Sequence, residues 1–222
     1  ENIKRIKERI FQAASRVGRK EDEIRLVAVT KNIGPTAINE AIRAGVNILG
    51  ENRVQEARTK MEQLQGNIDW HMIGHLQRNK AKNVVPHFAF IHSLDSAALA
   101  AEINRQAEKI NKKIKVLIQV NLSQENSKSG SSLENLFPLV EEASSYRFLE
   151  LKGLMTIPPW DPEKENSRPY FSHLRKVMKE IESTYGLDSF TELSMGMSHD
   201  FEIAIEEGAT FVRLGTAIFG PR

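Results

Sequence analysis

Short apolar runs alternate with longer amphipathic stretches along most of the chain. The runs end in polar or glycine residues and span residues 24–30, 46–50, 70–74, 89–93, 116–121, 151–156, 190–195 and 211–215. Within residues 26–29 and 116–120, apolar and β-branched side chains occupy nearly every position. Strands that are covered on both faces have this pattern, so the runs predict a parallel sheet.

The stretches between the runs show the three-to-four-residue spacing that is typical of amphipathic helices. One apolar stripe consists of Ile3, Ile6, Ile10, Ala14 and Val17, and Gly18 follows it as a helix-ending residue. Further helices are predicted over residues 97–109, 133–144, 170–181 and 199–207. Ser96 and Ser132 stand where they can cap the first two of these.

About eight strands, most of them paired with a helix, predict a (β/α)₈ TIM barrel at the small end of its size range. A doubly wound open sheet is the alternative arrangement. No linker or low-complexity tract divides the chain, so we expect one domain over residues 1–222. The longest irregular stretch, residues 158–168, follows a strand and should overhang the functional face of such a barrel.

Composition narrows the class of protein further. The chain has 31 Lys and Arg against 29 Asp and Glu, and 40% of its residues are hydrophobic. This balance excludes disorder as the main state and provides no overall field for nucleic acid or membrane. The absence of cysteine excludes disulfides, zinc–thiolate sites and a cysteine nucleophile. The first residues mix both charge signs without an apolar stretch, so we expect a cytoplasmic protein.

Functional residues of a barrel gather where its strands end. The predicted strand ends offer Lys31, Glu51, Asn52, His75, Asn121, Met155, Thr156, residues 194–198 and residues 213–216. Lys31 is the most reactive type among them, because partial withdrawal from water favours a free amine that can attack a carbonyl. A lysine that merely extends its charged end into solvent is the alternative.

Two turns of small residues follow the last two predicted strands. The first contains Gly196 between Ser194 and Ser198, and the second contains Gly215 and Thr216 after Arg213. Glycine lets the backbone approach a ligand, and free N–H groups and hydroxyls suit a phosphate. Barrels commonly hold a phosphate after strands seven and eight, although simple helix capping would explain each turn alone.

Together, the lysine and the turns predict a site for a carbonyl compound that carries a phosphate. Two ligands fit this description. One is a phosphorylated sugar, as in a Schiff-base lyase, and the other is pyridoxal 5′-phosphate (PLP), whose aldehyde would take the lysine. The residues alone leave both possibilities open.

Longer motifs resemble one known family over nearly the whole chain. They occupy residues 26–31, 50–56, 70–80, 92–96, 119–121, 127–130, 153–159, 192–198 and 212–220. Examples are Thr30-Lys31, Gly50-Glu51-Asn52 and Arg213-Leu214-Gly215-Thr216. In content and order they are similar to the PLP homeostasis protein family, the YggS/PROSC group. Two small departures from the family pattern are His199 and the turn at residues 32–35.

The resemblance implies a barrel similar to the N-terminal domain of alanine racemase, PLP fold type III, with PLP held as a Schiff base on Lys31. It implies that Asn52 lies beside the ring and that Arg213 lies at the phosphate or the ring edge. The phosphate-side motifs implied by the family comprise Ser194, Gly196, Met197, Ser198, Gly215 and Thr216. Family members are thought to bind, buffer and deliver PLP, with apo-PLP-dependent enzymes as acceptors, and are not known as turnover enzymes.

The residues give a physical reason to expect a carrier rather than an enzyme. PLP withdraws electrons best when a carboxylate keeps its ring nitrogen protonated, whereas Arg213 cannot accept a proton. The alternative is an active PLP-dependent amino-acid enzyme such as a racemase. From another class, an anion- or RNA-binding module could use the basic cluster at Arg78, Lys80 and Lys82, although a solvated helix face is favoured.

Other candidates are weaker. His71 and His75 have the spacing of a helical metal pair, but they span a strand end and a turn, so no metal site is expected. Lys128 is a candidate for a second, reversible PLP amine, with a solvated loop lysine favoured. No exposed apolar stripe suggests a partner subunit, so a monomer is expected.

Overall fold

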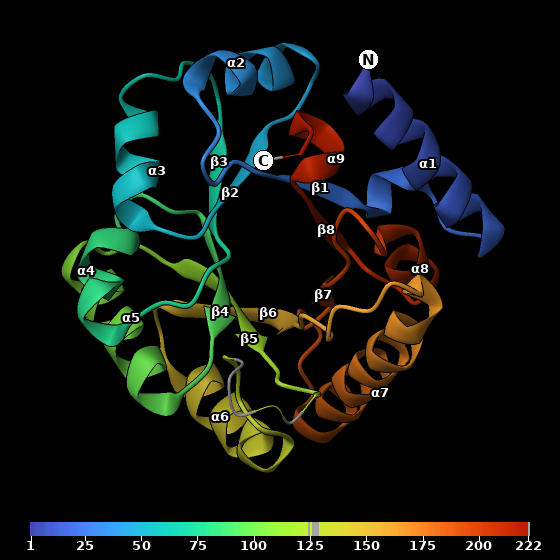
Figure 1. Cartoon of the computed structure of the whole chain (residues 1–222). Coiled ribbons are helices and arrows are strands. Elements are labelled where there is room, and N and C mark those ends of the chain that lie inside the picture. The colour runs from blue at the N-terminus through green and yellow to red at the C-terminus, as the bar shows by residue number, and fades with distance from the viewer. Residues whose placement is uncertain (124, 126–128, 222) are drawn as a thin grey trace.

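Eight parallel strands close into a barrel in which each strand pairs with the next along the chain (Figure 1). The computed structural model describes residues 1–123, 125 and 129–221. The strands are β1 Arg25–Val29, β2 Ile48–Glu51, β3 Asp69–Met72, β4 Phe90–Leu94, β5 Ile114–Gln119, β6 Leu149–Met155, β7 Glu192–Ser194 and β8 Phe211–Leu214. Because β1 also pairs with β8, the barrel prediction is confirmed and the open sheet is excluded.

Helices surround the barrel on its outside (Figure 1). The α-helices are α1 Asn2–Arg16, α2 Pro35–Arg43, α3 Val54–Met61, α4 Ala81–Val84, α5 Ala97–Lys109, α6 Leu133–Ser145, α7 Arg168–Tyr185, α8 Phe201–Glu206 and α9 Thr216–Phe219. Three short 3₁₀ turns are η1 Glu21–Glu23, η2 Arg78–Lys80 and η3 Lys164–Ser167. Among the described residues, no helix is long and apolar enough to span a membrane.

The strands and the longest helices follow the sequence prediction closely, with three differences. The helix predicted over residues 199–207 begins only at Phe201, because residues 198–200 form a turn in which the Met197 carbonyl accepts from the Asp200 N–H. The loop predicted over residues 158–168 contains η3 and meets α7 at Arg168. The short helices α2, α3, α4 and α9 were missed, since a few turns hold too few apolar positions to establish a period.

Apolar side chains pack in two layers that the barrel wall separates. The inner cluster fills the barrel and consists of Val27, Ile48, Ile73, Phe90, Leu117, Met155 and Phe211. The larger outer cluster lies between the strands and helices, and includes Ala28, Leu49, Ile91 and Ile118. Consecutive residues of one strand therefore serve both layers, which explains the continuous apolar runs. One domain over residues 1–222 stays the prediction.

Candidate functional site

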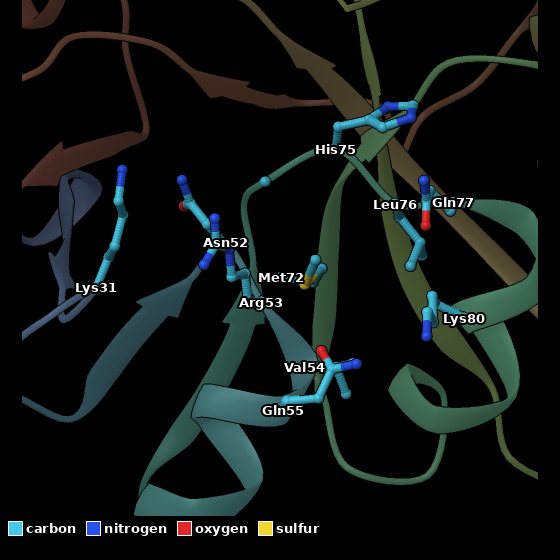
Figure 2. A pocket seen from close by; sticks show the side chains of 11 residues that line it. Lys31, Asn52, Arg53, Val54, Gln55, Met72, His75, Leu76, Gln77 and Lys80 are labelled. Atoms are coloured by element: carbon cyan, nitrogen blue, oxygen red, sulfur yellow. The ribbon is translucent and has the colours of Figure 1, made fainter.

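Lys31 lies at the rim of a cavity of about 490 Å³ where β1, β2 and β3 end (Figure 2). The lysine lies two residues after the end of β1, behind Thr30, and is half-buried. Asn52 follows β2 and borders the same cavity. The remaining lining residues are Arg53, Val54, Gln55, Met72, Gly74, His75, Leu76, Gln77 and Lys80. The structure therefore brings the predicted amine and the predicted ring-side amide into one site.

The cavity has an apolar floor and a rim of hydrogen-bond donors. Val54, Met72 and Leu76 are buried beneath it. Among the described residues, the lining contains three fixed cations, Lys31, Arg53 and Lys80, and no carboxylate. Positive charge without a lining carboxylate favours an anionic ligand, and the volume is typical of small-molecule sites.

Gly74 allows the end of β3 to pass close to Asn52. A Cβ atom built on Gly74 would lie 2.7 Å from both the Cα and the carbonyl oxygen of Asn52. Real Cβ contacts of this kind do not occur, so any other residue would displace the turn that carries Asn52. The glycine therefore contributes to the shape of the cavity through backbone packing.

The turns after β7 and β8 are joined by one hydroxyl group. Ser198 Oγ accepts hydrogen bonds from the N–H groups of Gly215 and Ala217, each at 3.2 Å. The Arg213 N–H donates to the Gly196 carbonyl at 3.0 Å. The two turns thus form one unit, whose N–H groups are held by a serine hydroxyl.

The structure requires a glycine at position 196 for a reason other than the predicted approach of the backbone to a ligand. It adopts a φ of +90°, and a Cβ atom there would lie 2.5 Å from the Cβ of Ala204 in α8. The glycine is therefore required by the close packing of α8 against the turn. Met197 also has a structural role in this turn, because its backbone N–H donates to Asp200 Oδ1 at 2.7 Å.

The strand register places the lysine and the turns at the same end of the barrel. Ala28 of β1 pairs with Leu214 of β8, so Lys31 and Gly215 follow neighbouring strands. The turn residues do not line the 490 Å³ cavity, which extends from Lys31 toward β2 and β3. Lys31 consequently stands between the cavity on one side and the joined turns on the other.

Arg213 lies inside the barrel rather than at its surface. Its side chain is buried, and it donates to Ser194 Oγ at 2.7 Å and to the Thr156 carbonyl at 2.9 Å. Burial lowers the pKa of Arg213 to about 10, so the guanidinium stays charged at neutral pH. Ser194 is also fully buried, and its hydroxyl contacts Arg213 instead of facing a free anion-binding turn.

Two buried histidines continue this contact into the barrel interior. His92 Nδ1 lies 2.9 Å from Ser194 Oγ, and His92 Nε2 lies 2.9 Å from His71 Nδ1. Because arginine can only donate, the Ser194 hydroxyl is free to donate to His92, and the chain then runs in one direction from Arg213 to His71. Ser194 and His92 therefore fix the position of the Arg213 guanidinium.

Both histidines are neutral. Burial lowers the pKa of His71 to about 3, and burial lowers the pKa of His92 well below its ordinary value, assisted by nearby positive charge. The rings pack against Phe90 and Phe211 with centroids 5.0–5.6 Å apart. A neutral pair adds no further charge to an interior that already holds the Arg213 cation among apolar side chains.

These depressed pKa values predict a loss of stability in acid. An unfolded histidine titrates near a pKa of about 6.5, whereas His71 in the folded protein titrates near 3. Between these values the unfolded chain binds protons that the folded chain refuses, so the free energy of unfolding should fall as pH falls. Each histidine contributes up to about 1.4 kcal/mol per pH unit.

Urea unfolding from pH 7 to pH 4 measures this slope. His71→Gln should reduce the slope by up to about 1.4 kcal/mol per pH unit, the contribution of one histidine. His87→Gln, at an exposed position, serves as the matched control. An unchanged slope in His71→Gln would contradict the assignment.

Comparison with known proteins identifies the family. The family model described as alanine racemase, N-terminal domain, matches residues 2–222. A protein of Aquifex aeolicus named pyridoxal phosphate homeostasis protein is 45% identical over 223 residues, which cover 100% of this chain and 97% of that protein. This chain belongs to the pyridoxal phosphate homeostasis protein family. The resemblance found in the sequence motifs is thereby confirmed.

Solved structures agree with this family and with its fold. The PipY protein of Synechococcus elongatus, solved with PLP bound, is 37% identical with a TM-score of 0.85, covering 95% of this chain and 100% of that one. An alanine racemase of Clostridium difficile is 16% identical with a TM-score of 0.72, covering 98% of this chain and 56% of that enzyme. The second likeness supports the barrel alone.

Several residues that border the site were missed in the sequence. Arg53, Gln55 and Gln77 line the cavity but were noted only within longer motifs, because they lie a few residues beyond the strand ends. Lys80 also lines the cavity, although the sequence suggested it only as part of a basic cluster. His92 was also missed, although a polar residue inside the apolar run of β4 is a signal of an internal hydrogen bond.

His71 and His75 do not share a site. His71 faces the barrel interior, whereas His75 lines the cavity and its Nδ1 lies 3.1 Å from Asp95 Oδ2. Within residues 1–123, 125 and 129–221, no group of three His, Cys, Asp or Glu side chains is arranged for a metal ion. Lys128, the candidate second amine, lies outside the described residues.

Proposed function

We propose that this protein binds PLP in the site around Lys31 and takes part in keeping the cellular supply of PLP in balance. The observation that carries this proposal is the half-buried Lys31 between a carboxylate-free cavity and the joined turns after β7 and β8. The bound PLP of the related PipY structure supports it, as does the printed name of the Aquifex relative.

The residues present fit this cofactor. Lys31 would hold the aldehyde carbon as a Schiff base, with loss of one water. The phosphate would be held by the hydroxyls of Ser198 and Thr216 and by the backbone of Gly196, since these groups lie at the neighbouring strand ends. The N–H groups of Met197 and Gly215 already donate to Asp200 and Ser198, so these two residues would shape the phosphate turns. Asn52 would contact the ring, because it borders the cavity beside Lys31.

Arg213 and Ser194 would serve the cofactor's ring nitrogen. When bound, PLP supplies an electrophilic aldehyde and an electron-accepting ring. Arg213 is a buried cation that Ser194 and Thr156 hold in place, and a guanidinium can only donate. A ring nitrogen that accepts a hydrogen bond from arginine stays unprotonated, and PLP is then a weak electron acceptor. We therefore propose that the protein stores and delivers PLP without turnover of its own, with apo-PLP-dependent enzymes as recipients.

Covalent capture tests the proposal directly. Purified protein that has been mixed with PLP should turn yellow, and borohydride should then fix a pyridoxyl group on the peptide that contains Lys31. A pyridoxyl group only on other lysines, or none, would contradict the assignment. A colourless protein that borohydride links to a phosphorylated sugar would show a lyase instead.

Turnover separates the carrier from the racemase alternative. The PLP-loaded protein should show no sustained racemisation or transamination of amino acids. A robust rate that disappears with Lys31→Ala would establish an enzyme. Transfer of PLP from the loaded protein to an apo-enzyme, followed through the recovered activity of that enzyme, tests delivery. A monomer and a cytoplasmic location stay predictions.

A further inference from the structure

A buried ionic cluster lies directly behind the turn that carries Lys31. Lys60 of α3 is only 6% exposed. Its Nζ donates to Glu51 Oε1 at 2.6 Å and to Glu56 Oε1 at 2.7 Å. It also donates to the Thr30 carbonyl at 2.5 Å. Lys60 therefore joins the end of β2, the first turn of α3 and the end of β1, although it does not line the cavity.

The cluster holds both neighbours of Lys31 in the chain. On one side, Thr30 Oγ1 donates to Glu51 Oε1 at 2.6 Å while the Thr30 carbonyl accepts from Lys60. On the other side, the Asn32 N–H donates to Glu56 Oε1 at 2.6 Å. The backbone of Lys31 is thus fixed at both ends by charge-assisted hydrogen bonds, which are stronger than neutral ones.

Asn32 shows that this turn is constrained. It adopts a φ of +59°, a left-handed conformation that asparagine adopts more readily than most residues with a side chain. Glu56 accepts the Asn32 N–H in this conformation. Burial raises the pKa of Glu56, but the hydrogen bonds from Lys60 and Asn32 outweigh it and bring the pKa below its usual value. Glu56 is therefore an ionised acceptor at neutral pH.

Stability alone is a poor reason for such a cluster. Replacing buried ion pairs with well-packed apolar residues is often neutral or stabilising. Here the hydrogen bonds do not fully offset the cost of burying Glu51. Burial raises the pKa of Glu51, and its Oε2 atom has no hydrogen-bond partner among the described residues. What the cluster does provide is a defined geometry for the turn on which the Lys31 side chain stands.

We propose that Lys60 and Glu56 are positioning residues for Lys31, fixing the turn at residues 30–32 so that the lysine amine is directed into the ligand site. This inference rests on the proposed function, because it concerns the capture of the PLP aldehyde by that amine. Lys60 and Glu56 act through the backbone of Thr30 and Asn32. Neither residue lines the cavity.

The test compares PLP with pyridoxine 5′-phosphate, which carries the same phosphate and ring but no aldehyde. Lys60→Met and Glu56→Ala should slow the appearance of the Schiff-base absorption and weaken PLP binding by about tenfold, as expected for one charge-assisted hydrogen bond. Both variants should bind pyridoxine 5′-phosphate as the wild type does. Glu56→Gln should recover part of the loss, because its side-chain oxygen can still accept from Asn32.

A readout without ligand tests the same contact. Hydrogen exchange at the Asn32 amide should be faster in Glu56→Ala than in the wild type, and Glu62→Ala, an exposed carboxylate at the end of α3, is the matched control. Equal loss of both ligands would mean general disruption and overturn the inference, as would unchanged PLP capture. Wild-type protein that captures no PLP on Lys31 would instead overturn the proposed function.

Discussion

Lys31→Ala should abolish covalent capture of PLP while leaving the fold intact. The side chain is half-buried at the cavity rim, and its loss leaves the inner and outer apolar clusters untouched. Borohydride should fix no pyridoxyl group on the remaining chain at stoichiometric PLP. The affinity for PLP should fall by about 100-fold, equivalent to about 2.7 kcal/mol, with the residual binding carried by the phosphate and the ring.

Two variants sharpen this result. Lys31→Arg keeps the positive charge but offers no amine for a Schiff base, so it should lose capture as Lys31→Ala does. Lys82→Ala removes an exposed lysine of α4 and should capture PLP normally. Absorption spectra and mass spectrometry of the reduced peptides provide the measurement. Normal capture by Lys31→Ala would assign the Schiff base to a different lysine.

Gly153→Ala should be among the most destabilising single substitutions in the barrel. Gly153 lies in β6 with a φ of +154°, and a Cβ atom there would stand 1.9 Å from the carbonyl oxygen of Glu192 in β7. The collision involves backbone on both sides, so no side-chain rotation relieves it. Backbone strain and overpacking together should lower the free energy of unfolding by about 2–6 kcal/mol.

Gly186→Ala is the matched control, because it makes the same substitution where space is open. Gly186 ends α7 in a left-handed conformation, with a φ of +62° and no atom within 4 Å of the added Cβ. Its cost should be that of the conformation alone, about 1–2 kcal/mol. Urea unfolding of both variants measures the difference. Equal losses in the two variants would show that the close approach of β6 and β7 is not what requires the glycine.

The strands could be predicted because burial on both faces leaves a signal in a few consecutive residues. The run at residues 26–29 is apolar throughout, since Val27 fills the barrel and Ala28 packs outward against the helices. The short helix α3 left no comparable signal: one of its buried positions is Lys60, which reads as a solvent-facing residue in the sequence. Burial of a charge depends on a partner, and the partner lies elsewhere in the chain.

The candidate site likewise contains residues that the sequence could predict and residues whose surroundings it could not. Lys31 and the glycine-containing turns were predicted because residues at the ends of parallel strands must meet at one end of a barrel. The burial of Arg213 and Ser194 could not be predicted, because the inner side of β7 and β8 is defined only once the barrel closes. The contact of Ser194 with His92 joins residues that are 102 positions apart.

The sequence by itself therefore determined the kind of fold and the family and singled out Lys31 as the candidate amine, since these depend on residue types at fixed local positions. Only the tertiary structure decided which polar groups stand behind that amine. Lys60, Glu56 and His92 acquire their roles from hydrogen bonds across neighbouring strands and helices. Such bonds require a donor and an acceptor to be brought within about 3 Å of each other, and a linear pattern does not specify that distance.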